Sequence, residues 1–517
     1  MTTSFPPISY PSKPVPPFTA EPPRNSFPGF FPDMWKDIIG KPYITVSSKG
    51  LANGLSEYFN DGADFGPDTP NTKTSGLQEG ITYIFAKGGG KIILGAGIFD
   101  LDVAYVQTTM AITNAHVIEV PENPDTNPII TIEIEGIASS LWDYQITYTP
   151  ASVTPITGSA GSVIFFNGYL NANGVGGSSI FGSAIPTSAN KYNNNVNIIL
   201  KNITFRTLPP TDTTQFQPGP VQLDNFAGFE LSNVVVDIYT SDGSIPNIES
   251  ISPQYANAIT VNPPSDGNGL AILDNVYTIG YQNGVVLSFG TNSVQHVQIK
   301  KLFIQFCRTG LFIGDAGNYS PLIEFADIEQ CTYPIWFNNT TPIWLPKARF
   351  QLQSQGANST TDWSNAKMYF NISGSANVYG DIEIYITGGS PTDNPLIGGS
   401  GPQYGSTLIF HQIQGYGSIA KYPITSMGQA TAGTTAGSVQ QLAQTYLPIQ
   451  KLVFYVNGYE NDTTTDQVID FLNAFSTVSA ITSNTTGLTV TASLTGLTIT
   501  APDATTTYSG IVVIEGY

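Results

Sequence analysis

A short pattern recurs through the middle of the chain and limits the folds that it can adopt. Each copy places apolar residues at its first and fourth positions, in segments 200–203 (Leu-Lys-Asn-Ile), 231–234 (Leu-Ser-Asn-Val), 273–276 (Leu-Asp-Asn-Val), 299–302 (Ile-Lys-Lys-Leu) and 325–328 (Phe-Ala-Asp-Ile). The last three are followed by a turn and a second apolar segment, which starts at Gly284, Gly310 or Pro334. These starts are 26 and 24 residues apart, and periods of about 20 to 50 residues are typical of solenoids, whose stacked coils share one core.

The composition favours many short strands joined by turns. Only 11% of the 517 residues are charged, against about a quarter in a typical soluble domain. Amide and hydroxyl side chains must therefore supply much of the solubility, and the 51 glycines suit frequent turns. With 41% hydrophobic residues, such a chain can bury a large core, and we predict a mainly β protein.

Segment 60–102 has the features of a cap at the start of a solenoid. Residues 75–86 show the apolar spacing of a helix. Three glycines at 88–90 end that helix, and residues 92–94 (Ile-Ile-Leu) predict a buried strand.

With the Asp61-Gly-Ala63 turn before the helix, this order of turn, helix, glycines and strand resembles the N-terminal cap of the pectate-lyase-like family of right-handed parallel β-helices. That family includes polygalacturonases and many viral tailspikes. The resemblance covers about 45 residues and implies a right-handed parallel β-helix. It differs at Gly95-Ala-Gly97, where the family usually has a Pro. It implies no particular activity, because such folds serve enzymes and adhesins alike.

The chain divides into four predicted parts. Residues 1–42 are Pro-rich and predict an extended arm. Residues 43–425 are assigned to the β-helix with its capping helix, and 426–440, which are small and polar, to a linker. Residues 441–517 predict a small α+β domain. Within it we expect a strand at 451–456, a helix at 465–475 and strands near Leu488, Leu497 and Ile511.

The two cysteines share the period of the coils. Cys307 and Cys331 are 24 residues apart, each just before a turn. We expect them to stack on adjacent coils, about 4.8 Å apart along the axis. Two arrangements remain open: a ladder of core thiols, or a disulfide between the coils.

Charge and hydropathy exclude two classes of partner. The net charge of -19 argues against nucleic acid, whose phosphates need a basic surface. The sequence shows no apolar run of 18 or more residues, so we expect no membrane span. A chain with few carboxylates loses few ion pairs when the pH falls. The composition is therefore also compatible with a hot acidic habitat.

The sequence indicates an extracellular location without Sec export. The first residues, MTTSFPPISYPSKPVPPF, lack the basic start and apolar stretch of a Sec signal peptide. A virion protein fits both features, since it is assembled inside the cell and leaves on the particle. Sequons for N-glycosylation, some of which arise by chance in an Asn- and Thr-rich chain, occur at Asn202, Asn318, Asn338, Asn339, Asn358, Asn371, Asn461 and Asn484.

No complete catalytic motif is present. The family's Asp-Asp, Gly-His-Gly and Arg-x-Lys motifs are missing, and Arg206 reads as a surface arginine at a coil corner. Glycosidase chemistry needs two carboxylates, for which Glu324, Asp327 and Glu329 are weak candidates. They equally suit solvated positions on a coil, with Glu324 and Glu329 facing outward together. We predict no metal site and no cofactor.

Aromatic residues on the late coils indicate a binding surface. Tyr333, Trp336, Trp344 and Trp363 could stack on sugar rings if they are exposed. Packing between coils is the alternative, because large aromatic side chains are usually mostly buried.

We therefore expect a virion structural protein of the surface spike, turret or tail-fibre type that attaches to host-surface glycan or glycoprotein. The N-terminal arm would bind other virion proteins, and a homo-oligomer, by analogy a trimer, would form. The alternatives are a secreted polysaccharide lyase or glycoside hydrolase, and an archaeal cell-surface adhesin.

Overall fold

Two helices and a long series of strands make up the described part of the chain. The computed structural model describes residues 42–48, 63–123, 128–137, 161–175, 177–184, 194–238, 254–261, 270–287, 296–314, 321–338, 343–354, 370–372, 378–388, 397–398, 412–415, 436–447, 449–460, 467–470, 478–483, 489–492, 496–500 and 508–516. Of the predicted Pro-rich arm, 1–42, only residue 42 is within these ranges. Neither of the two helices in these ranges has the length and apolar character of a membrane-spanning helix.

Two parallel sheets form most of the structure. The 15-stranded sheet contains β1 (Tyr43–Val46), β2 (Gly90–Leu94), β3 (Gly97–Asp100), β5 (Ile130–Glu135), β6 (Ser162–Phe165), β8 (Asn194–Lys201), β9 (Ile203–Thr207), β11 (Phe226–Ile238), β13 (Leu270–Ile279), β15 (His296–Ile299), β16 (Leu302–Gln305), β18 (Leu322–Glu329), β20 (Ile343–Ser354), β22 (Val378–Gly388) and β24 (Gln412–Gly415). The 9-stranded sheet contains β4 (His116–Val120), β7 (Ser179–Ser183), β10 (Val221–Leu223), β12 (Asn257–Val261), β14 (Asn283–Leu287), β17 (Thr309–Gly314), β19 (Tyr333–Asn338), β21 (Phe370–Ile372) and β23 (Ile397–Gly398).

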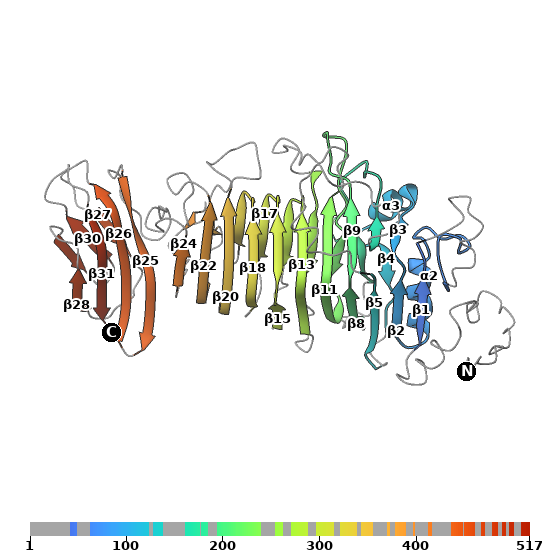
Figure 1. Cartoon of the computed structure of the whole chain (residues 1–517), viewed down its shortest axis with the longest axis horizontal. Helices are drawn as coiled ribbons and strands as arrows, with labels where there is room; N and C mark the ends of the chain where they lie inside the picture. Colours follow the sequence, from blue (N-terminus) through green and yellow to red (C-terminus); the bar gives the residue numbers. More distant parts are fainter. Residues whose placement is uncertain are drawn as a thin grey trace, which may run out of the picture.

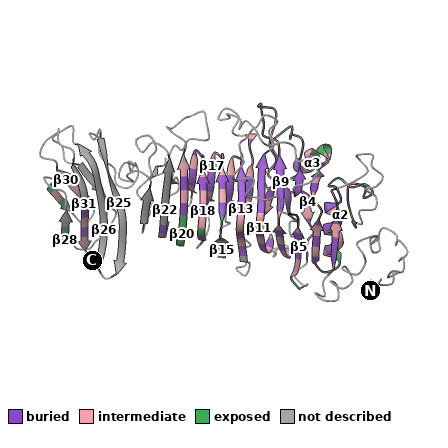
Figure 2. Cartoon of the chain, in the orientation of Figure 1, coloured by how far each residue is buried: buried purple, intermediate pink, exposed green. Residues whose placement is uncertain are grey.

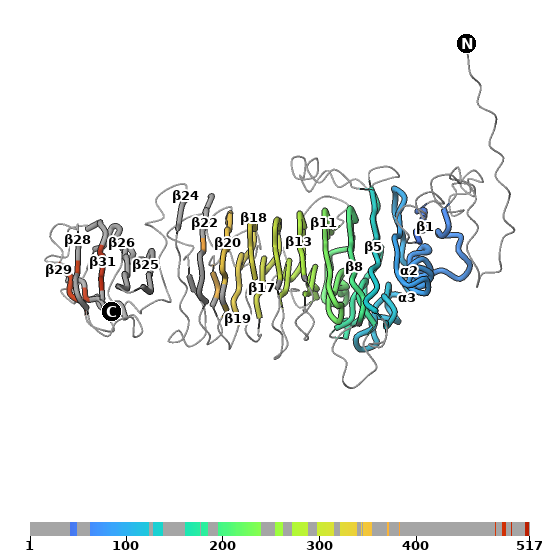
Figure 3. Tube along the Cα trace, turned by 90° about the horizontal axis from the view of Figure 1, so that it is seen from below, coloured from blue at the N-terminus to red at the C-terminus, as the bar shows by residue number. Residues whose placement is uncertain are grey.

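The strands of both sheets stack in chain order, which is a solenoid-like arrangement. Each successive coil places its strands beside those of the coil before it, in parallel, from β1 and α2 at one end of the stack to β24 at the other (Figure 1). The view turned by 90° shows the same elongated stack (Figure 3). The prediction of a mainly β chain with stacked parallel strands is thereby confirmed.

The core runs along the inside of the stack (Figure 2). The first and fourth positions of the repeat form two buried rows, in which the register aligns Leu200, Leu231, Leu273, Ile299 and Ile323, and likewise Ile203, Val234, Val276, Leu302 and Ala326. The second apolar segments are also in register, since Val285 pairs with Leu311 and Leu311 with Ile335.

The fifth copy of the repeat was assigned two residues too late. Ile299 pairs with Ile323 and Leu302 with Ala326, so this copy is 323–326 and not 325–328. The error has a physical cause: Phe325 mimics the first apolar position of the pattern, although it occupies the polar corner position between the two buried rows. Backbone register, which depends on the neighbouring coil, decides the alignment.

A row of asparagines forms the corner of three successive coils. Asn202, Asn233 and Asn275 have positive φ values of 57°, 54° and 56°, a left-handed conformation that asparagine tolerates better than most residues. The Asn233 amide donates to Asn202 Oδ1 at 3.0 Å, and the Asn275 amide donates to Asn233 Oδ1 at 2.7 Å. The corner divides each coil of the larger sheet into a first limb before it and a second limb after it.

A helical cap covers the first coils, as expected. The helix α2 (Leu77–Ala86) begins where Thr74 Oγ1 accepts a hydrogen bond from the Gln78 N–H, and it buries Leu77, Ile81 and Ile84. At Gly89 the backbone has a φ of 98°, and a Cβ there would lie 2.5 Å from the Thr131 carbonyl oxygen. Only glycine fits this position.

A second helix, α3 (Val103–Met110), was not predicted. Asp102 caps it, because its Oδ1 accepts from the Tyr105 N–H at 2.8 Å. The helix is short and only Val106 and Met110 are buried, so its apolar spacing gave little signal.

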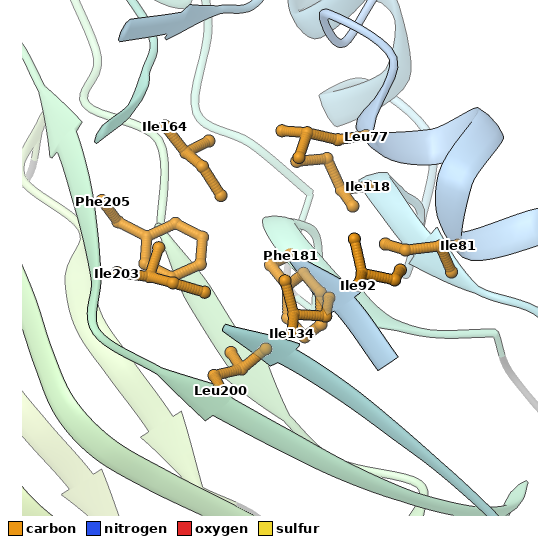
Figure 4. A pocket seen from close by; sticks show the side chains of 10 residues that line it. All are labelled: Leu77, Ile81, Ile92, Ile118, Ile134, Ile164, Phe181, Leu200, Ile203 and Phe205. Atoms are coloured by element: carbon orange, nitrogen blue, oxygen red, sulfur yellow. The ribbon is translucent and has the colours of Figure 1, made fainter. Parts of the chain in front are cut away.

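Beneath the cap lies an apolar cavity (Figure 4). It is lined by Leu77, Ile81, Ile92, Ile118, Ile134, Ile164, Phe181, Leu200, Ile203 and Phe205. A ligand site needs a few polar groups to orient its ligand, and none of these side chains has one. The cavity therefore belongs to the core.

The C-terminal strands form two antiparallel sheets beyond β24 (Figure 1). One sheet has the order β25 (Ala436–Leu447), β26 (Ile449–Glu460), β31 (Tyr508–Gly516), β28 (Val478–Ser483), and the other has the order β27 (Gln467–Asp470), β30 (Gly496–Thr500), β29 (Thr489–Ala492). The predicted strand at 451–456 lies in β26, and Leu497 and Ile511 lie in strands, whereas Leu488 lies outside the described residues.

Two expectations for this region were wrong. The helix predicted at 465–475 contains β27, which pairs antiparallel with β30. The β-branched pair Val468 and Ile469 suits a strand, and pairing with a neighbour outweighs a short helical spacing. The predicted linker 426–440 overlaps β25, whose pairing with β26 already starts at Ala436.

The asparagine corner should contribute measurably to stability. Asn233→Ala removes two side-chain hydrogen bonds and leaves a Cβ in the left-handed region, so we expect the free energy of unfolding to fall by about 2–4 kcal/mol. Asn233→Gly loses the same bonds without the backbone strain, and we expect it to be about 1 kcal/mol more stable than the alanine variant. Urea unfolding would measure both. An alanine variant as stable as the wild type would contradict the structural role of the row.

Candidate functional site

The outer face of the second limb carries two of the three carboxylates singled out in the sequence, Asp327 and Glu329. The parallel register aligns two outward rows across β13, β16, β18 and β20: Tyr277, Phe303, Asp327 and Gln351 in one, and Ile279, Gln305, Glu329 and Gln353 in the other. Tyr277 and Ile279 are fully buried, whereas the later members of both rows are half-buried. The face is thus covered at β13 and opens to solvent from β16 to β20.

Hydrogen bonds connect the rows across the coils. Tyr277 Oη donates to Gln305 Oε1 at 2.5 Å, and Gln305 Nε2 donates to Glu329 Oε2 at 2.6 Å. Gln351 Nε2 donates to Asp327 Oδ2 at 3.1 Å. Each carboxylate therefore receives a neutral amide donor, and no ion pair is found at either within the described residues.

Asp327 holds a proton unusually well. Burial, together with the negative charge of Glu329, raises its pKa from 3.8 to about 7. Its Oδ1 is inaccessible to solvent and has no hydrogen-bond partner among the described residues. A carboxyl group in this state can donate a proton near neutral pH.

Glu324 does not belong to this pair. It lies on the first limb, before the corner, where its Oε1 accepts from Gln298 Nε2 at 2.6 Å and its side chain is exposed. The structure thus brings together Asp327 and Glu329, which are two residues apart on one face of β18. The expected pairing of Glu324 with Glu329 was wrong, because the coil turns its corner between them.

Two of the predicted aromatic residues meet on the outer face of the smaller sheet. The rings of Tyr333 and Trp336, both on β19, are 5.2 Å apart, and Trp336 contacts Phe312 of β17 edge to face at 5.8 Å. All three are half-buried. They therefore combine packing between coils with a partly open surface. The side chains of Trp344 and Trp363 lie outside the described residues.

The two faces adjoin at one turn. Residues 330–332 connect Glu329 at the end of β18 to Tyr333 at the start of β19. The carboxyl rows and the aromatic group therefore lie on either side of the same edge of the stack.

Arg206 is not the surface residue that was expected. Its side chain is 3% exposed, and it binds Asp237 through two hydrogen bonds, from Nε to Oδ1 at 2.8 Å and from Nη2 to Oδ2 at 2.6 Å. The partner lies on the next coil, in register with Arg206. This buried ion pair joins two adjacent coils and occupies the guanidinium of Arg206.

The other candidates have structural roles or lie outside the described ranges. Both cysteines are free and buried. Asn371 is 6% exposed, and Asn202 is bonded within the corner row, so glycosylation at either would disrupt the fold. Asn338 is exposed. The remaining sequons, Asn318, Asn339, Asn358, Asn461 and Asn484, are outside the described residues.

The described residues contain no group of three or more His, Cys, Asp or Glu side chains that could hold a metal ion. His116 is buried against Ser179, whose Oγ lies 2.9 Å from its Nδ1. Burial lowers the pKa of this imidazole from 6.5 to about 4, which keeps it neutral in the core.

Comparison with known proteins does not identify a function. No family model matches the chain, and a search of curated proteins gives no match. The function must therefore be argued from the site itself.

The proton on Asp327 should appear in the pH dependence of stability. Its folded pKa of about 7 lies above the ordinary value of 3.8, so the folded chain keeps a proton that the unfolded chain loses. This stability is fully present below the ordinary pKa of 3.8 and is lost as the pH rises from there through about 7. We expect Asp327→Asn to raise the free energy of unfolding by about 1–3 kcal/mol at pH 8, allowing for solvent screening, and by less than about half as much at pH 5, where the unfolded chain has already lost its proton but the folded chain has not.

Glu324→Gln is the matched control for this experiment. Its carboxylate is exposed and accepts from a similar glutamine, so we expect a change within about 0.5 kcal/mol at both pH values. Urea unfolding at the two pH values would measure the four differences. Equal effects of Asp327→Asn at pH 5 and pH 8 would refute the raised pKa.

Proposed function

We propose that this protein is a virion structural protein of the surface spike, turret or tail-fibre type, and that it attaches to host-surface glycan. In this proposal the stacked coils form a right-handed parallel β-helix. The Pro-rich arm binds other virion proteins, and the chain acts as a homo-oligomer, by analogy a trimer.

The observation that carries the proposal is the pairing of hydrogen-bonding and aromatic faces at one edge of the stack. Gln305, Glu329 and Gln351 offer amide and carboxylate groups, which suit sugar hydroxyls that both donate and accept. Across the turn, Tyr333 and Trp336 offer rings that can stack on the apolar face of a sugar. Rows of such groups along successive coils suit an extended glycan.

Protonation behaviour supports a mildly acidic setting for the particle. Burial raises the pKa of Asp224 to about 6, that of Asp327 to about 7, and to a lesser extent those of Asp100 and Glu119. These carboxyls stabilise the fold more as the pH falls towards the ordinary carboxyl range. His116 has the opposite effect. As the pH falls from its ordinary pKa of 6.5 to about 4, the unfolded chain takes up a proton on this imidazole before the folded chain does, so the fold loses stability.

Particles from the source culture provide the direct test of the virion assignment. We expect mass spectrometry to find this chain in purified particles at a stoichiometric level, and negative-stain images to show it as a projection. Recovery of the chain free in the medium, with none in the particles, would overturn the assignment.

Glycan attachment makes a prediction about the aromatic group. Trp336→Ala removes the ring that contacts both Tyr333 and Phe312, so we expect binding to array glycans to weaken by about tenfold or more. Trp336→Phe keeps a stacking surface and should retain most binding. Glu324→Gln, on the first limb, should bind as the wild type does. Undiminished binding by a folded Trp336→Ala variant would exclude this face.

Glycoside hydrolysis is a second candidate, favoured by the proton on Asp327. The Cα atoms of residues two apart on a strand are about 6.6 Å apart, so two side chains on one face are close enough for the carboxyl separations of about 5–9.5 Å that glycosidases use. Asp327 would be the general acid and Glu329 the base. If this is the activity, polysaccharide cleavage, assayed as new reducing ends, is abolished in Asp327→Asn and Glu329→Gln and unchanged in Glu324→Gln. Absence of cleavage of every glycan bound on the array would exclude it.

A further inference from the structure

The only two cysteines of the chain lie opposite each other on adjacent coils. Before them, Gln305 of β16 pairs with Glu329 of β18. After them, Thr309 of β17 pairs with Tyr333 of β19. Each of these pairs is 24 residues apart, as are Cys307 and Cys331. The register on both sides therefore fixes the two cysteines at the same rung of the stack.

Both side chains point into the core at this rung. Each is 0% exposed, and burial together with the neighbouring Cys307 thiol raises the pKa of Cys331. Cys307 Sγ lies 3.4 Å from the Gln305 carbonyl oxygen, and Cys331 Sγ lies 3.3 Å from the Glu329 carbonyl oxygen. The two residues therefore have the same conformation, repeated one coil later.

We propose that Cys307 and Cys331 form a reversible disulfide that crosslinks two adjacent coils. Paired residues on adjacent coils are about 4.8 Å apart, which is inside the Cα separation of about 4.4–6.8 Å that disulfides span. The two Cβ atoms point in the same direction rather than at each other, so the bond requires the coils to approach slightly. A strained bond of this kind is more easily reduced than an ordinary structural disulfide.

The oxidant is a small-molecule disulfide of the glutathione type. One cysteine, as its thiolate, attacks this reagent and forms a mixed disulfide, releasing one reagent thiol. The second cysteine displaces the other reagent thiol and closes the Cys307–Cys331 bond. The two cysteines lose two protons and two electrons, and the reagent leaves as two thiols. Burial raises the pKa of Cys331 well above its ordinary value, so the exchange takes place while the coils are still assembling or transiently open.

The test compares the full-length protein produced in an oxidising cell compartment with the same protein produced in a reducing one. Both samples are denatured, alkylated and examined by intact mass and by peptide mapping under non-reducing conditions. We expect the oxidised sample to contain no free thiol and a peptide joining Cys307 to Cys331. We also expect dithiothreitol to lower its melting temperature by about 2–6 °C.

Single and double Cys→Ala variants are the controls. The double variant should melt at one temperature with or without dithiothreitol, which separates the crosslink from other effects of the reagent. Two alkylatable thiols in the oxidised wild-type sample would overturn the proposal. A disulfide between two chains, or a mixed disulfide as the end product, would overturn it as well.

Discussion

The parallel register between coils is the constraint on which the rest of the structure depends. Backbone hydrogen bonds join each strand to the strand of the preceding coil, so a residue at one position is stacked on its equivalent about one period away. Inward positions become continuous apolar rows, and outward positions become continuous polar or aromatic rows. Core and surface are therefore both assembled from residues that are distant in sequence.

This constraint explains what the sequence could predict. The apolar positions of the first four copies of the repeat, the strands that contain Gly284 and Gly310, and the capping helix depend on local patterns and are confirmed. The contacts between outward side chains depend on which residues of adjacent coils are aligned by the backbone register. The Arg206–Asp237 pair spans 31 positions, and neither residue belongs to a motif. The amide donors Gln305 and Gln351 were missed for the same reason.

The errors have the same origin. Phe325 fits the apolar pattern locally, yet the register of β15 and β16 assigns it to the corner, and this moves Glu324 away from Glu329. The segment containing β27 has helical spacing, yet pairing with β30 makes it a strand. In both cases a partner outside the local window decided the conformation, as is common for strands.

The same stacking bears on the choice between attachment and catalysis. The carboxyl pair of β18 is held by glutamines on the coils before and after it, and those side chains are fixed in turn by the backbone ladder. In the proposed attachment to an extended glycan, side chains fixed in this way would lose little conformational entropy on binding. The site lies on an outer face that is open from β16 to β20, whereas catalysis gains most where water is excluded. The physical chemistry of this face therefore favours attachment, and the proton on Asp327 is the one feature that favours hydrolysis.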